Sequence, residues 1–221
     1  MLTANVLRRV VQIGWQNSTG SGFTVEHCGR QYLLTAKHVI DGFVGGELNI
    51  FDGSDFVPKN FELVGHSSDK DIAVLAHESQ LTVTFPMPVS DKGMSLGQSA
   101  YFLGFPYGYS YVLKQNGALP LVKSATVSAF NVDGRLVLDG HNNPGFSGGP
   151  VVFIPNGRQT GQFSVAGIVT SYPTYNEKVY DEKGHATNFH IRINPGIVFA
   201  APILEAVKLI DDNPIGFRLQ K

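Results

Sequence analysis

Residues 145–150 read Gly-Phe-Ser-Gly-Gly-Pro, and this hexapeptide places one serine, Ser147, among three glycines. A serine hydroxyl is a weak nucleophile at neutral pH unless a base lies beside it and amide donors face the oxyanion that its attack creates. Glycines permit a tight backbone path that turns N–H groups inward. The stretch therefore indicates a candidate nucleophile loop, with a plain glycine-rich turn as the alternative.

Two upstream segments supply the residue types that such a serine needs. Residues 33–39 read Leu-Leu-Thr-Ala-Lys-His-Val and contain His38, and residues 69–75 read Asp-Lys-Asp-Ile-Ala-Val-Leu and contain Asp71. With the serine loop, they resemble the three motifs of trypsin-like (chymotrypsin-fold) serine proteases, in the same chain order of His, Asp and Ser. A lone His or Asp is usually structural, whereas three motifs in order are hard to obtain by chance.

The resemblance implies a catalytic triad and a mechanism. Ser147 would attack the scissile carbonyl, His38 would take its proton and return it to the leaving amine, and Asp71 would hold the imidazole in the reactive tautomer. The backbone amides of Gly145 and Ser147 would form the oxyanion hole. The expected protein is a serine endopeptidase that cleaves a protein or peptide substrate through an acyl-enzyme intermediate and needs no cofactor.

Flanking segments narrow the resemblance to the protease domain of bacterial Do-type (HtrA-like) serine proteases. The similarity runs from about residue 10 to about residue 210, and no PDZ domain is expected after it. The peptide-gated oligomers of that family are therefore not carried over. The flanking segments with the similarity are residues 20–23, 95–108, 143–145 and 194–203.

Two positions depart from the family pattern. Lys37 replaces the usual small residue before the base, and we expect its side chain to point outward. Phe146 stands where digestive trypsins have Asp and Do-type enzymes usually have Asn. Activation by N-terminal cleavage is therefore not expected, and what holds the oxyanion loop stays open. The alternative function is a latent or catalytically silent trypsin-fold protein that binds or regulates until an activating protein partner orders this loop.

The composition favours a folded enzyme over a nucleic-acid or membrane protein. The 221 residues are 43% hydrophobic and 16% charged, and the formal net charge is −1. This length can bury a large core, and the near-zero charge gives no electrostatic case for nucleic acid or an anionic membrane. No apolar run approaches the roughly 20 residues of a membrane helix.

The single cysteine, Cys28, excludes an intramolecular disulfide. With no second Cys and no Cys/His pair at zinc spacing, no metal site is predicted. The N-terminus lacks the apolar segment of a signal peptide. If the chain is full length, we expect it to be cytoplasmic.

Short segments rich in Val, Ile, Phe and Tyr, separated by Gly, Pro, Asn and Asp, predict strands throughout. No helical crossovers separate them, which disfavours a parallel sheet. The sequence thus predicts an all-β fold of two antiparallel six-stranded β-barrels with a short C-terminal helix. The expected strands are residues 10–15, 22–26, 32–35, 48–51, 61–66 and 71–77 in the first barrel, and 100–105, 124–130, 136–139, 150–154, 165–171 and 189–193 in the second.

The expected domain division puts the active site between the two barrels, because His38 and Asp71 fall in the first and Ser147 in the second. Two prolines mark the segment that divides the barrels as a linker. The expected parts are an N-terminal barrel at 1–85, a linker at 86–96, a C-terminal barrel at 97–200, and a helix and tail at 201–221.

By the resemblance, the substrate pocket is lined by His141 and Asn142 before the nucleophile and by Thr170, Ser171 and Tyr172 on a later strand. His141 stands where trypsins keep an Asp, so a strong preference for Lys or Arg is not expected. Two hypotheses stay open. Either His141 and Asn142 select a polar or acidic side chain, or the pocket is shallow and takes a small aliphatic residue, which we favour.

Overall fold

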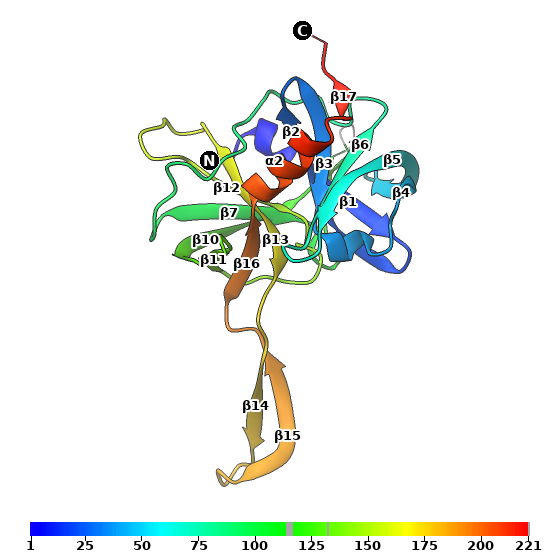
Figure 1. The fold of residues 1–221 in the computed structure, drawn as a ribbon. Coiled ribbons are helices and arrows are strands. Elements are labelled where there is room, and N and C mark those ends of the chain that lie inside the picture. Colours follow the sequence, from blue (N-terminus) through cyan, green and yellow to red (C-terminus); the bar gives the residue numbers. More distant parts are fainter. Residues whose placement is uncertain (114–116, 132, 221) are drawn as a thin grey trace.

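Two closed antiparallel barrels make up most of the molecule (Figure 1). The computed structural model describes residues 1–113, 117–131 and 133–220. In the first barrel the strands hydrogen-bond in the order β3-β2-β1-β4-β5-β6, and pairing of β6 with β3 closes it. Its strands are β1 (Val10–Trp15), β2 (Ser18–His27), β3 (Arg30–Thr35), β4 (Gly46–Phe51), β5 (Phe56–Ser67) and β6 (Ile72–His77).

The second barrel closes in the order β10-β11-β16-β13-β12-β7. The predicted fold of two six-stranded barrels followed by a helix is therefore confirmed. The strands of this barrel are β7 (Ser99–Gly104), β10 (Leu121–Phe130), β11 (Leu136–Asp139), β12 (Pro150–Phe153), β13 (Ser164–Ser171) and β16 (Ile197–Pro202).

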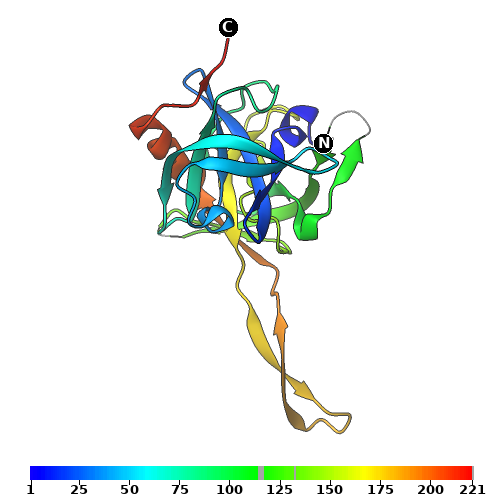
Figure 2. The same cartoon turned by 90° about the vertical axis from the view of Figure 1, so that its right-hand side faces the viewer.

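One predicted barrel strand, residues 189–193, was assigned wrongly. These residues belong to β15 (Ala186–Ile193), which pairs with β14 (Tyr175–Tyr180) in a two-stranded hairpin that projects away from the barrels (Figures 1 and 2). Phe189 and Ile191 are 74% and 54% exposed, so their apolar pattern does not mark a buried strand. β16 takes the sixth place in the barrel instead.

A two-residue turn explains how β2 and β3 form a tight hairpin. His27 pairs with Arg30, and the intervening Cys28 and Gly29 both have positive φ, 48° and 73°. Two central residues with positive φ match the right-handed twist of the flanking strands. The hairpin delivers β3, buried from Gln31 to Thr35, to the segment that carries His38.

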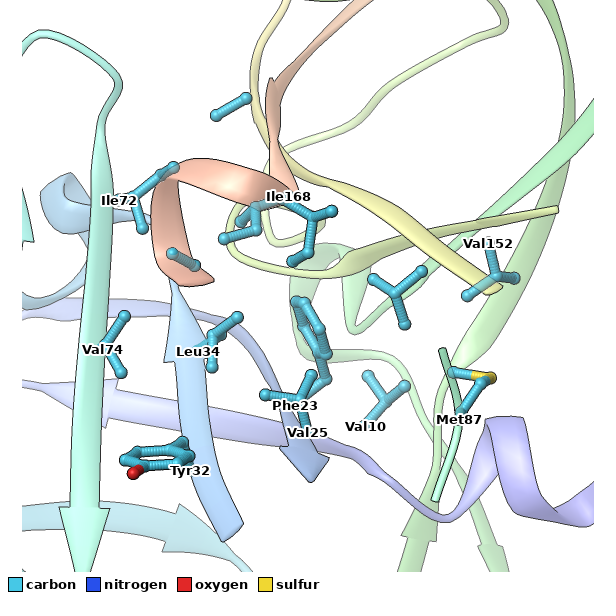
Figure 3. Packing of buried hydrophobic residues seen from close by; sticks show 14 of the residues in the cluster. Val10, Phe23, Val25, Tyr32, Leu34, Ile72, Val74, Met87, Val152 and Ile168 are labelled. Atoms are coloured by element: carbon cyan, nitrogen blue, oxygen red, sulfur yellow. The ribbon is translucent and has the colours of Figure 1, made fainter. Parts of the chain in front are cut away.

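A continuous apolar core joins the two barrels. Phe23 and Leu34 from the first barrel lie in one cluster with Val152 and Ile168 from the second, and Met87 of the interbarrel segment packs at its margin (Figure 3). Burial of this much apolar surface fixes the barrels against each other.

A buried ion pair connects the N-terminal segment to the first barrel. The buried Arg9 guanidinium pairs with Glu26 at 3.1 Å and donates to Phe85 O at 2.9 Å, which ties the N-terminal segment to the chain leaving the first barrel. The other elements are helices α1 (Ala4–Leu7) and α2 (Ile203–Asp212), the paired strands β8 (Tyr111–Leu113) and β9 (Gly117–Leu119), 3-10 turns at Lys37–Ile40 and Pro106–Gly108, and β17 (Phe217–Arg218), which pairs with β3.

Candidate active site

Pairing of β3 with β6 brings the predicted base and acid together. Thr35 pairs with Ala73, so the residues that follow β3 lie beside those that precede β6. His38 lies in the 3-10 turn after β3, and its ring Nδ1 is 2.6 Å from Asp71 Oδ2. The backbone amide of His38 donates to the other carboxylate oxygen, Oδ1, at 2.9 Å. The carboxylate thus holds both the ring and the backbone of His38.

Asp71 adopts a backbone conformation that is uncommon outside glycine, with φ of 56°. Asp tolerates this left-handed region better than most residues. In this conformation its carbonyl oxygen also accepts the Lys37 amide at 3.2 Å. Carbonyl and carboxylate therefore both face the segment that carries His38.

Ser147 lies between β11 and β12 on the second barrel, and its carbonyl oxygen accepts the amide of Ser21 on β2 at 2.8 Å. Its hydroxyl donates to Thr170 O at 3.4 Å. Within the described residues no hydrogen bond joins this hydroxyl to His38. Gly20 lies against the backbone of the serine loop and the side chain that follows His38, since a Cβ there would crowd both Ser147 O and Val39.

Held carbonyls define the geometry of the loop around Ser147. Pro144 O accepts the amide of Tyr107 at 2.9 Å, and Phe146 O accepts the amide of Gly149 at 2.9 Å. A trans peptide points its N–H opposite to its C=O. The amides of Gly145 and Ser147, which share peptides with these two carbonyls, are thereby oriented, and neither has a protein acceptor in the described part of the chain.

Two glycines permit this loop. Gly145 has φ of 102°, and a Cβ there would collide with Phe105 O. Gly148 has φ of 84°, and a Cβ there would collide with Ser21 O. Only glycine combines these conformations with so close an approach of backbone to backbone.

Phe146 is fully buried and packs edge-on against Phe102, with ring centroids 4.9 Å apart. The loop is therefore anchored in the core of the second barrel by an apolar side chain, where trypsins use a carboxylate.

The other departure, Lys37, pairs with Asp41 at 2.8 Å. A hydrogen bond and the charge of Lys37 lower the pKa of the Asp41 carboxyl.

The expected pocket residues differ in exposure. Asn142 is 1% exposed, and its Oδ1 has no hydrogen-bond partner within the described residues, while Nδ2 lies 3.5 Å from Ser171 O. His141 is exposed, and its carbonyl oxygen accepts the ammonium of Lys123 at 2.7 Å. Sequence reasoning missed Lys123, because only strand pairing brings it here. Thr170 is largely buried, and Tyr172 is half-buried.

Sequence spacing also missed a group of possible metal ligands away from this site. One ligand atom each from His27, Cys28 and Asp211 lie within 4.8 Å of one another, and the His27 and Asp211 side chains already pair at 2.8 Å. Cys28 and Asp211 are exposed.

Among the helices of the described residues, none has both the length and the apolar character needed to span a membrane.

A family model described as trypsin-like peptidase domain matches residues 20–161. The chain belongs to this trypsin-like peptidase family. The match includes all three candidate triad positions, His38, Asp71 and Ser147.

The curated relatives of this trypsin-like peptidase are Do-type proteases. A probable periplasmic serine endoprotease, DegP-like, from Marinomonas sp. (strain MWYL1) is 30% identical over 203 residues, which cover 90% of this chain and 36% of the relative. Protease Do-like 8, chloroplastic, from Arabidopsis thaliana is 33% identical over 146 residues, covering 60% and 32%. The chain thus spans about a third of the length of these relatives. The name of the first relative places it in the periplasm, and the name of the second places it in the chloroplast. The cytoplasmic location of this chain stays a prediction.

Solved structures share the fold. A serine endoprotease from Yersinia pestis superimposes with a TM-score of 0.61 at 23% identity, covering 94% of this chain and 63% of that one. An HtrA-type protease solved with a tripeptide gives 0.62 at 21% identity, covering 95% and 61%. This likeness confirms the double-barrel fold of the trypsin-like peptidase.

Proposed function

We propose that this chain is a serine endopeptidase with Ser147 as nucleophile, His38 as general base and Asp71 as orienting acid. The observation that carries the proposal is the double contact of the Asp71 carboxylate with His38, 2.6 Å to Nδ1 and 2.9 Å to the backbone amide. A carboxylate at Nδ1 favours the tautomer with its proton there, which leaves Nε2 free to accept a proton.

Ser147 Oγ would attack the carbonyl carbon of the scissile peptide while its proton passes to His38 Nε2. Collapse of the tetrahedral intermediate breaks the C–N bond, the imidazolium gives its proton to the leaving amine, and an acyl ester remains on Ser147. Water then attacks the ester with His38 again as base, which releases the acid and restores the hydroxyl. The Ser147 hydroxyl must first rotate from Thr170 O toward the ring, as apo sites of this kind commonly require.

The amides of Gly145 and Ser147 would bind the negative oxygen of the tetrahedral intermediate. Their lack of protein acceptors among the described residues supports this role, as does the bond from Tyr107 to Pro144 O, which orients the Gly145 amide. A latent protein would have this loop collapsed, with its amides turned away. The held carbonyls therefore favour an enzyme assembled at rest over a silent module that awaits an activating partner.

The substrate would be a protein or peptide whose side chain enters a pocket between His141, Asn142, Thr170, Ser171 and Tyr172. The ammonium of Lys123, 2.7 Å from His141 O, adds a positive charge at this end of the pocket. Like charges repel across a few ångströms. This disfavours Lys and Arg, in agreement with both hypotheses for the pocket, and a small aliphatic residue remains the favoured one.

A fluorophosphonate probe of serine hydrolases tests the proposal directly. We expect one adduct on Ser147 by intact mass and peptide mapping, and none on the Ser147→Ala variant. Hydrolysis of an unfolded protein substrate should be lost in the same variant. Well-folded wild-type protein that forms no adduct and cleaves nothing would contradict the proposal and favour the latent alternative.

A further inference from the structure

Ser21 on β2 is fully buried at the junction of the two barrels, and each of its polar atoms has a defined partner. Its amide donates to Ser147 O at 2.8 Å, and its carbonyl accepts the hydroxyl of Thr35 at 2.7 Å. Its hydroxyl accepts the amide of Phe105 at 3.0 Å and donates to Gly145 O at 2.7 Å. One residue of the first barrel thus binds the serine loop of the second barrel twice, through its backbone amide and through its hydroxyl.

These contacts matter because of which peptides they hold. Three successive carbonyls, those of Pro144, Gly145 and Phe146, belong to the peptides that lead into Ser147. The first and third are held by amides of the second barrel, from Tyr107 and Gly149. The middle carbonyl is held by the Ser21 hydroxyl, and the N–H of the same peptide, that of Phe146, donates to Asn143 O at 3.2 Å. The middle peptide links the two that carry the oxyanion donors, so its rotation would turn both donors.

The same hydroxyl also holds the segment that orients the first donor. Phe105 donates to Ser21 Oγ, and two residues later the amide of Tyr107 binds Pro144 O. Loss of the hydroxyl would leave the buried Phe105 amide and the partly buried Gly145 O without a partner, which is costly for backbone groups shielded from water. The backbone on both sides would be driven to reorient toward other partners.

We propose that Ser21 is a positioning residue that keeps the oxyanion loop of Ser147 in its reactive conformation. The proposal rests on the proposed function, and it assigns to the first barrel a role in catalysis besides supplying His38 and Asp71. Ser21 does not touch the substrate. It acts through Gly145, by fixing the peptide that separates the two oxyanion donors.

The test compares Ser21→Ala with Thr24→Val. Thr24 lies on the same strand, is also fully buried, and bonds through its hydroxyl to Thr82, away from the serine loop. Both variants lose one buried hydroxyl, so both should lose some stability. At a temperature where both are folded, we expect Ser21→Ala alone to lose about 10²-fold in kcat and in fluorophosphonate labelling rate, with KM little changed, as when an oxyanion donor is lost.

Hydrogen exchange supplies a readout that does not need turnover. We expect the hydrogen-bonded loop amides, those of Phe146, Gly148 and Gly149, to exchange faster in Ser21→Ala than in Thr24→Val or wild type, including in a Ser147→Ala background. Equal kcat and equal exchange in the two variants would overturn the proposal. An inactive wild type would contradict the proposed function, and the exchange comparison would still judge the role of Ser21.

Discussion

Asp71 binds His38 at two points, with Oδ2 2.6 Å from the ring Nδ1 and Oδ1 2.9 Å from the backbone amide. The second contact fixes the carboxylate relative to the chain that carries the ring. A single rotation therefore cannot separate the two side chains. The β14–β15 hairpin contains the same arrangement at an exposed site, where the Asp181 carboxylate accepts the backbone amide of His185 at 2.8 Å and lies 3.2 Å from the His185 ring Nδ1.

Asp71→Asn should keep the fold and lower kcat by a factor on the order of 10⁴, the loss known for the equivalent change in a protease of this fold. An amide donor opposite Nδ1 would select the tautomer with its proton on Nε2, which cannot accept the serine proton. Steady-state hydrolysis measures the effect, with Asp181→Asn as the matched control. Near-normal turnover in Asp71→Asn would assign the acid to another residue.

Phe146→Ala should lower the free energy of unfolding by about 3–5 kcal/mol, because it empties a fully buried aromatic site. It should also slow fluorophosphonate labelling of the folded protein, because the buried ring of Phe146 anchors the loop that carries Ser147. Phe153→Ala removes an equally buried ring from the same core but outside the loop. Denaturant unfolding and labelling should show a similar loss of stability in both variants and a labelling defect in Phe146→Ala only.

Glu26→Gln should destabilise the protein by about 3–5 kcal/mol, because it leaves the Arg9 charge buried without its counter-ion. Arg9 is fully buried and its partner side chain is 4% exposed. Turnover of the folded protein should be unchanged, since the pair lies outside the site. Thermal melting measures the loss, and Asp41→Asn at the exposed pair with Lys37 should leave the melting temperature unchanged. Equal melting temperatures for the two variants would refute the prediction.

Replacement of residues 175–192 by a short glycine linker should leave both barrels folded. The hairpin side chains are mostly exposed, and Tyr175 pairs with Ile193, so the ends to be joined are close. We expect the free energy of unfolding to change by less than about 1 kcal/mol, as for surface changes. Loss of a cooperative melting transition would show that the barrels need the hairpin.

A peptide library should yield few cleavages after Lys or Arg. The exposed His141 and the nearby ammonium of Lys123 offer no carboxylate to a cationic side chain. Enrichment of small aliphatic residues before the cleaved bond would support a shallow pocket, and enrichment of acidic or polar ones would support selection by His141 and Asn142. A profile dominated by Lys or Arg would contradict both hypotheses.

The sequence predicted the fold well where local signals agree with tertiary packing. Turn residues and β-branched runs marked eleven of the twelve barrel strands, and the motif order placed His38 and Asp71 on the first barrel and Ser147 on the second. The prediction of the twelfth strand, at residues 189–193, was wrong because the apolar residues there face solvent in the β14–β15 hairpin. The true sixth strand, Ile197–Pro202, follows Asn-Pro-Gly, which resembles a loop in isolation.

The support of the serine loop was not predictable, because its contacts join residues far apart in sequence. Ser21 and Gly145 are separated by 124 positions, and no periodicity links them. Phe146 was recognised as a departure, yet its burial against Phe102 depends on the pairing of β7 with β12. Likewise, Lys123 reaches His141 because β10 pairs with β11, which sets Thr126 beside Asp139.

The contact between Ser21 and Gly145 has a consequence for how the protein is made. Translation completes the first barrel before the ribosome reaches Ser147, and N-terminal units generally fold first during synthesis. The serine loop therefore takes its final shape against a surface that already exists. A half-made chain has His38 and Asp71 without Ser147, and an isolated second half would have Ser147 without the hydrogen bonds from Ser21. Neither fragment would hold the complete proposed triad.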